Sequence, residues 1–291
     1  MKNNRFVLMV LTPIIVLFMT FMILPIGGAF VISLFDYNPV RSQNPFIGFA
    51  NFTKLLNDRI FVKSLTNTLT FVFVTVALNI AITLTLAFLI TMLRSNKLRS
   101  LFRVLFFMPC IAPLVASATV WRGLYAVDYG LINNILRGVF HVPAINWIGT
   151  PAFVLPAIVI FTLWADMGYN IILFSAGMDG IPTDFYEAAE LDGAGHIKRF
   201  FTITLPLMGR TFSFVLAMTL ISHFQMFAQF QVLATKGGPN QSANVLTYYI
   251  YKTAFQSRDM GYASAISVVL FLLIMVFTAI QQRINRVDWG Y

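Results

Sequence analysis

Charged residues are scarce in this sequence. They make up 11% of its 291 positions, against about 25% in an ordinary soluble domain, whereas hydrophobic residues make up 58%. A soluble fold of ordinary composition is thereby excluded, and the chain is predicted to be a membrane protein. The net charge of +9 comes from basic residues dispersed over several loops, which argues against nucleic-acid binding and favours anchoring at a lipid surface.

Catalytic and metal-binding motifs are also missing. The single cysteine, Cys110, excludes a disulfide or a cysteine-based metal site within one chain, and its place in an apolar run predicts a small buried side chain. The three histidines, His141, His196 and His223, fall in three different predicted compartments and predict no metal site. Because the phosphate-binding pattern G-x-x-x-x-G-K-S/T does not occur, we expect no cofactor in this chain and no enzymatic activity of its own.

Long apolar runs are what the sequence has instead. Crossing a hydrocarbon core about 30 Å thick takes about 20 helical residues. Because an open strand would leave backbone groups unpaired in lipid, we expect an all-α polytopic membrane protein with six spans in one domain, residues 1–291. The predicted spans cover approximately residues 6–35, 66–93, 104–121, 151–177, 211–232 and 260–282.

The orientation of the spans follows from basic residues near their ends. The first apolar run resembles a secretory signal but is about twice the usual length of 7 to 15 residues, so we expect it to be retained as a span. The short linker at residues 94–103 holds four basic residues and no acid, which indicates the cytoplasmic side. Both termini are then cytoplasmic, in agreement with the terminal basic residues Lys2, Arg5, Arg283 and Arg286.

Acidic residues are concentrated in residues 179–209, which we call the 179–209 segment. Glu187, Glu190 and Asp192 lie within six positions of one another. A helix is predicted to start near Pro182, with Asp184 and Glu187 at capping-box spacing, and to end at a left-handed Gly193. Apolar spacing then resumes as far as Pro206, which indicates a helix-turn-helix. From the residues alone, a solvated linker on the membrane and a docking surface for a cytoplasmic partner fit equally well.

The fifth span is unusually polar for a segment in lipid. Drawn as one continuous helix, it places Ser222, Gln225 and Gln229 within about 60° of one another, and Thr219 and His223 extend this arc. Such residues are expected to face the bundle interior or a wet cavity. Their hydroxyl and amide groups, set among phenylalanines, suit a sugar in a substrate path. Hydrogen bonds to neighbouring or partner helices are the alternative interpretation.

Asp166 is the only acidic residue inside a predicted span. At the centre of a span an aspartate costs about 2.5 to 3.5 kcal/mol on insertion scales, so it is expected to point away from lipid. A place toward the cytoplasmic end of the fourth span favours a structural or gating role. Proton coupling is the alternative.

The 179–209 segment resembles the EAA signature of binding-protein-dependent ABC importer permeases. The resemblance rests on Glu187-Ala188-Ala189, Asp192-Gly193-Ala194, Phe200, Ile203, Leu205 and Pro206 at matching spacing. The wider resemblance is to the sugar-importer branch, of the lactose, glycerol-3-phosphate and maltose type, and its further motifs are individually weak. They are Pro25, Gly48-x-x-Asn51-Phe52, Pro109, Trp164, Ile181-Pro182, Gly237-Gly238-Pro239 and Tyr251-x-x-x-Phe255.

The resemblance implies a type I importer permease in the bacterial cytoplasmic membrane. A second permease subunit would complete the translocation path, two copies of an ATPase would bind ATP and Mg²⁺, and an extracytoplasmic solute-binding protein would deliver a sugar or short oligosaccharide. The residues implied to contact the ATPase are Glu187, Ala188, Ala189, Asp192, Gly193, Ala194, Phe200 and Pro206. The maltose-type permease itself carries extra N-terminal spans, so its six-span relatives are the better comparison.

Two alternatives remain open at this point. The transported solute could be a non-sugar such as glycerol-3-phosphate. A different class of protein, an ion-coupled secondary carrier, would need an ion site, for which Asp166 is the sole hint.

Overall fold

The computed structural model describes residues 2–284 as a helical chain that divides into two compact units. Residue 1 and residues 285–291, which include the basic Arg286, lie outside the described part. One unit joins the chain up to Val62 with Leu246–Leu273, and the other joins Lys63–Val245 with the chain from Ile274 onward. Among the described residues the β-pairing consists of an isolated antiparallel bridge between Phe35 and Phe46, so the all-α prediction is confirmed.

The first unit contains the N-terminal helices and the first part of the last one. Its elements are α1 (Lys2–Phe18), the π-helical η1 (Met19–Ile23), α2 (Leu24–Ile32), α3 (Ala50–Asn57), α14 (Leu246–Tyr251), the π-helical η5 (Lys252–Gln256) and the first part of α15 (Met260–Ile284). The Asp58 carboxylate accepts hydrogen bonds from Tyr249 (2.5 Å) and Tyr262 (2.6 Å), which joins the start of the second span to α14 and α15. Burial raises the pKa of this carboxyl, but the hydrogen bonds outweigh it and hold the pKa below its usual value.

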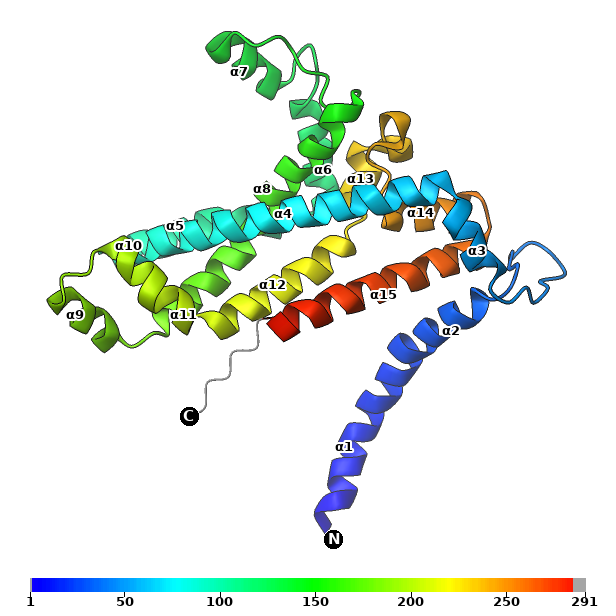
Figure 1. Cartoon of the computed structure of the whole chain (residues 1–291), viewed down its shortest axis with the longest axis horizontal. Coiled ribbons are helices and arrows are strands. Elements are labelled where there is room, and N and C mark those ends of the chain that lie inside the picture. Colours follow the sequence, from blue (N-terminus) through cyan, green and yellow to red (C-terminus); the bar gives the residue numbers. More distant parts are fainter. Residues whose placement is uncertain (1, 285–291) are drawn as a thin grey trace. The chain divides into compact units, whose positions relative to one another are not determined.

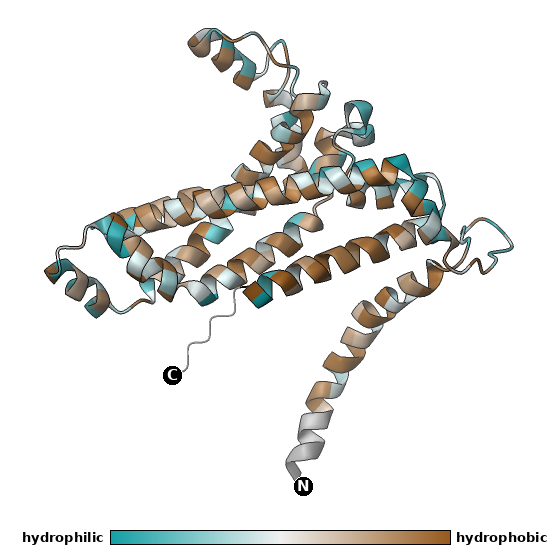
Figure 2. Cartoon of the chain, in the orientation of Figure 1, coloured by the Kyte–Doolittle hydropathy of each residue, from teal (hydrophilic) through white to brown (hydrophobic). Residues whose placement is uncertain are grey.

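The second unit contains the remaining helices (Figure 1). They are most of α4 (Arg59–Thr91), α5 (Asn96–Ile111), α6 (Leu114–Leu124), α7 (Leu131–Phe140), α8 (Pro151–Asp179), α9 (Thr183–Leu191), α10 (His196–Arg199), the π-helical η2 (Phe200–Thr204), α11 (Leu205–Leu207), α12 (Gly209–Phe224), α13 (Ala228–Leu233), the 3₁₀ turns η3 (Thr235–Gly237) and η4 (Pro239–Gln241), and the end of α15. Hydrophobic residues run along the long helices, and hydrophilic ones gather at helix ends and connections (Figure 2).

Five helical stretches are long and apolar enough to span a membrane, and a sixth is bent. The five are Met9–Ile32, Arg59–Thr91, Pro151–Asp179, Gly209–Leu233 and Met260–Ile284. In the third expected span, α5 and α6 meet at an angle of 94°. Pro113 causes this bend, because it cannot donate a backbone hydrogen bond and it holds the preceding Ala112 in an extended conformation (ψ 139°).

The fifth span is also interrupted. The helix α12 ends at Phe224, and α13 begins at Ala228, with Phe227 between them in a non-helical conformation (φ −132°, ψ −50°). No proline or glycine marks this break in the sequence. Non-helical backbone at membrane depth is tolerated where it is buried in protein or lines a cavity, and the structure places a cavity there, as described below.

Within the second unit, α5 and α8 touch backbone to backbone. A Cβ atom on Gly168 would collide with the main-chain carbonyl of Phe106 on α5. Small residues at helix contacts allow this close approach in membranes. Further along α8, the Asn170 side-chain amide donates to Asn79 Oδ1 on α4 (2.7 Å) and to Thr219 Oγ1 on α12 (2.9 Å). Asn170 therefore connects three spans through buried hydrogen bonds.

Candidate functional site

The 179–209 segment folds as the expected helix-turn-helix. Its first helix, α9, begins at Thr183, directly after Pro182. The predicted capping box does not form: α9 has no side-chain hydrogen bond at its start, because the capping position is occupied by Pro182, which has no side-chain acceptor. Asp184 lies in the first turn of α9, where its negative charge interacts favourably with the positive end of the helix dipole.

The turn after α9 is a Schellman motif. Gly193 adopts the left-handed conformation (φ 74°), as its position predicted. The Ala194 amide donates to the Ala189 carbonyl at 2.9 Å, and the Gly193 amide donates to the Glu190 carbonyl at 3.0 Å. The backbone of three residues of the signature, Ala189, Gly193 and Ala194, thus forms the turn itself, while Asp192 is the residue that ends the helix.

The second arm of the segment is tied to α9 by two side-chain contacts. Tyr186 and Thr204 share a hydrogen bond between hydroxyls (3.0 Å), and Arg199 Nη1 donates to Glu190 Oε2 (3.1 Å). The arm runs through α10, η2 and α11 almost directly into the fifth span. The break falls at Met208, two residues after the expected stop at Pro206, because Pro206 sits at the first turn of α11, where proline is tolerated.

Phe200 anchors this arm to the second span. Its ring packs against Phe88 near the end of α4, with ring centroids 4.6 Å apart. The signature residue Phe200 therefore faces the protein, whereas Pro206 is exposed. The two residues named together in the signature have different surroundings.

The outer surface of the segment combines carboxylates with uncovered apolar side chains. Glu187, Ala188 and Asp192 are exposed, and Ala189 and Ala194 are partly so. Leu191 is 90% exposed and Ile197 is 73% exposed. Contiguous exposed apolar patches mark sites that contact proteins or membranes, and these two side chains are candidates for such a contact. Leu191 was not among the residues predicted to form this surface, although its place directly after Glu190 in an acidic helix is a signal for it.

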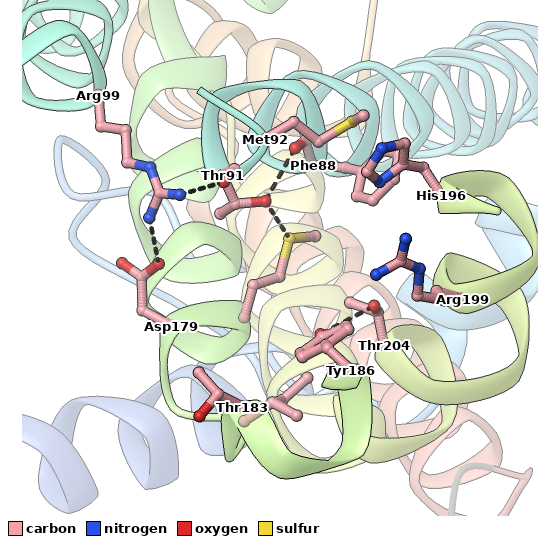
Figure 3. A pocket seen from close by; sticks show the side chains of 12 residues that line it. Phe88, Thr91, Met92, Arg99, Asp179, Thr183, Tyr186, His196, Arg199 and Thr204 are labelled. Atoms are coloured by element: carbon pink, nitrogen blue, oxygen red, sulfur yellow. Dashed lines mark hydrogen bonds and ion pairs between the residues drawn. The ribbon is translucent and has the colours of Figure 1, made fainter. Parts of the chain in front are cut away.

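A pocket of about 400 Å³, with a largely apolar wall and several charged groups, lies between this segment and the ends of three spans (Figure 3). Arg99 and Asp179 stand on one side, and His196 and Arg199 stand on the other. Thr183, Tyr186 and Thr204 add hydroxyl groups to its wall. The segment therefore faces the ends of α4, α5 and α8 across this pocket.

A second cavity, of about 240 Å³, lies where the third and fifth spans are broken. Polar groups on its wall come from Thr162 and Asp166 of α8 and from Gln229 of α13. Gln229 is buried, and its Oε1 atom has no hydrogen-bond partner among the described residues. A buried amide oxygen without a partner is costly unless a ligand or water satisfies it. The apolar wall is formed by Pro109, Cys110, Ala112, Leu114, Phe161, Ala165 and Met226, with Ser117 at the bend.

The five residues of the predicted polar arc do not lie on one helical face, because the break at residues 225–227 separates Gln229 from the rest. Thr219 and His223 are buried, and His223 Nδ1 lies 2.8 Å from the Thr219 carbonyl. Ser222 and Gln225 are exposed. Only Gln229 lines the cavity. The role of the five residues in the path stays a prediction, but the geometry that motivated it, a continuous helix, is corrected.

Asp166 lines the cavity, and its orientation away from lipid stays a prediction. Its Oδ2 atom lies 3.8 Å from His223 Nε2, and it belongs to the cavity wall. It sits near the middle of α8 rather than toward the cytoplasmic end. Cys110 lines the same cavity and is half-buried, so it is less enclosed than predicted.

Residues 80–287 match the model of a family described as the binding-protein-dependent transport system inner membrane component. The chain belongs to this family. Members span the inner membrane as the permease part of an ABC transporter, which is the membrane-embedded role that the resemblance implied.

Curated members of the family align over most of their length. The trehalose/maltose transport system permease protein MalF of Thermococcus litoralis is 35% identical over 278 residues, which cover 96% of this chain and 92% of that protein. The lactose transport system permease protein LacF of Rhizobium radiobacter is 32% identical over 275 residues, which cover 92% of this chain and 90% of that protein.

Solved structures share the fold. A chain of a bacterial ABC transporter that imports the acidic polysaccharide alginate superposes with a TM-score of 0.87 at 22% identity, over 98% of this chain and 96% of that one. The expected type I importer fold is therefore confirmed for this member of the family.

Proposed function

We propose that this chain forms half of the translocation path of an ATP-driven importer for a carbohydrate, with a second permease subunit forming the other half. ATP and Mg²⁺ would be bound by two copies of a separate ATPase subunit. A solute-binding protein would dock on the outer loops, at residues 36–63, 122–150 and 236–259. Both termini and the 179–209 segment would then lie in the cytoplasm.

The exposed surface of the 179–209 segment is the observation that carries this proposal. Leu191 and Ile197 are uncovered on a segment that lies between two spans and that a rigid Schellman turn holds in shape. Two contacts between its arms, at Glu190–Arg199 and Tyr186–Thr204, let it move as one piece. A partner subunit that closes on this surface would therefore displace the spans on either side of it, α8 and α12.

The cavity at the broken spans supports a carbohydrate as the solute. Its wall offers a carboxylate, an amide oxygen without a partner, two hydroxyls and the ring of Phe161. Such groups can bind the hydroxyls and the apolar face of a sugar ring. A volume of about 240 Å³ is below the range of about 300 to 1,000 Å³ typical of ligand pockets, in keeping with a path shared between two subunits. The relatives named for trehalose, maltose and lactose transport support the same solute class.

Uptake of labelled sugars into vesicles tests this proposal. The vesicles would carry this chain with its partner subunits, ATP inside and the binding protein outside. Import should require both, and Glu187→Ala or Gly193→Asp should sharply lower it while the subunits remain assembled. Gly193→Asp is expected to be the more severe change, because a side chain at φ 74° is strained whatever space surrounds it.

If the protein were an ion-coupled secondary carrier, the vesicle experiment would give the opposite result. Uptake by this chain alone, abolished by an ionophore and by Asp166→Asn but unaffected by changes in the 179–209 segment, would refute the ATP-driven proposal. Import of glycerol-3-phosphate in place of sugars, with ATP still required, would overturn only the solute class.

A further inference from the structure

Two arginines of α5 pair with Asp179, the last residue of α8. Arg103 of α5 donates from Nη2 to Asp179 Oδ2 at 2.7 Å, and Arg99, one turn earlier, places Nη1 3.9 Å from Asp179 Oδ1. Arg99 also donates from Nε to the Leu93 carbonyl (2.7 Å) and from Nη2 to the Thr91 carbonyl, at the end of α4. Figure 3 shows Arg99 between Thr91 and Asp179. We call Arg99, Arg103 and Asp179 the clamp.

The clamp lies next to the 179–209 segment. Gly180, Ile181 and Pro182 are all that separate Asp179 from α9. A displacement of α9 is therefore expected to displace the end of α8 at Asp179, which the clamp holds.

The same pair of helices also forms the wall of the cavity. At its other end α5 reaches the 94° bend, where Pro109 and Cys110 line the cavity opposite Asp166 of α8. Between the clamp and the cavity, the backbones of α5 and α8 touch at Gly168 and Phe106. Two helices fixed at the end and in the middle are expected to move as a unit.

The ion pair is partly buried on the Arg103 side, whereas the Asp179 side chain is 40% exposed. The Arg103 side chain is 26% exposed, and its Nε atom is buried with no partner among the described residues. Asp179 is thus the carboxylate that compensates this guanidinium. An exposed ion pair contributes little to stability, so the expected consequence is geometric: without Asp179, α5 is no longer bound to the end of α8 that moves.

We propose that Asp179 is a positioning residue that couples the 179–209 segment to the cavity, by making α5 follow α8. The proposal rests on the ATP-driven function proposed above, because it concerns how displacement of that segment reaches the solute path.

Transport per ATP hydrolysed is the quantity that tests it. In the complete complex reconstituted in vesicles, Asp179→Asn should lower the amount of sugar imported per ATP by about fivefold or more, the low end of typical coupling between sites. ATP hydrolysis itself should persist. The conservative Asp179→Glu, which keeps a carboxylate beside both Arg99 and Arg103, should hold the ratio within about twofold of the parent.

A matched control comes from a second Arg–Asp pair in the chain. Arg41 and Asp36 form an ion pair of 3.0 Å on an outer loop, where both side chains are more exposed. Asp36→Asn should leave the ratio unchanged. A loss in this control as large as that in Asp179→Asn would overturn the assignment of coupling to Asp179.

Two further results would overturn the proposal. The first is an unchanged ratio in Asp179→Asn, or import and hydrolysis falling together so that the ratio is kept. The second is loss of assembly in Asp179→Asn, since the carboxylate would then serve folding and not coupling. Failure of the parent complex to import with ATP would instead contradict the proposed function, so the two failures are distinguishable.

Discussion

Gly168→Ala tests the contact between α5 and α8. The added Cβ would overlap the carbonyl oxygen and carbon of Phe106 and the Cα of Phe107, which are backbone atoms and cannot turn aside as a flexible side chain would. Overpacking typically costs about 1 to 3 kcal/mol. Backbone overlap suggests the upper end of that range, and the better helix propensity of alanine offsets about 1 kcal/mol. The expected net loss is about 2 kcal/mol.

Thermal unfolding of the purified chain in detergent measures this loss, and Gly138→Ala is the matched control. Gly138 is also helical, in α7, but a Cβ there meets nothing within 4 Å. At roughly 2 to 4 °C per kcal/mol, Gly168→Ala should lower the Tm by about 4 to 8 °C, whereas Gly138→Ala should leave it unchanged or raise it slightly. A Tm for Gly168→Ala at or above that of the parent would refute the close backbone contact.

Three further predictions concern individual polar side chains. Asn170→Leu should destabilise the chain by about 1 to 2 kcal/mol in thermal unfolding. It removes two interhelical hydrogen bonds, worth on average about 0.6 kcal/mol each, and it leaves the Asn79 side-chain oxygen without its partner. An unchanged Tm would contradict this prediction. Gln229→Leu should weaken sugar uptake without lowering the Tm, because the Oε1 atom that it removes has no hydrogen-bond partner among the described residues. A large fall in Tm with normal uptake would assign Gln229 to folding. The lowered pKa of Asp58 stabilises the fold above the unfolded pKa of about 3.9, and this contribution is lost as the pH falls through the folded pKa. Asp58→Asn should therefore lower the Tm at neutral pH and flatten its decline in acid, and an acid decline as steep as in the parent would sink this assignment.

The positions of the helices could largely be predicted from the sequence, because few secondary structures satisfy the backbone hydrogen bonds in lipid. Apolar runs longer than about 20 residues have to be helical, and their ends coincide with charged or turn-forming residues. The helix-turn-helix of the 179–209 segment was also predictable, since Gly193 is the residue type that a left-handed turn requires.

The breaks in the third and fifth spans illustrate what local patterns do not reveal. Pro113 could have indicated the first break, although prolines such as Pro156 are accommodated inside a helix elsewhere in this chain. The second break, after Phe224, has no proline or glycine. It depends on burial around a cavity that exists only once the helices have packed, and it separates Gln229 from the arc to which periodicity assigned it.

The clamp was beyond the reach of sequence analysis for a different reason. Arg103 and Asp179 are 76 positions apart, and each looked like an ordinary charge at the end of a span. Only the packing of α5 on α8 brings them together. Similarly, Asn79 and Asn170 stand out as polar residues in apolar runs, but their pairing requires the folded bundle.

The central claim, that an ATPase subunit docks on the 179–209 segment, is tested most directly by site-specific cross-linking. In a Cys110→Ser chain, a thiol-attached cross-linker at Leu191→Cys or Ala188→Cys would be compared with one at Asp128→Cys, an exposed position on a predicted outer loop. In the assembled complex, the two positions of the segment should form adducts with the ATPase subunit and the outer position should form none. Absence of adducts from Leu191→Cys and Ala188→Cys in a complex that still hydrolyses ATP and imports solute would contradict the claim.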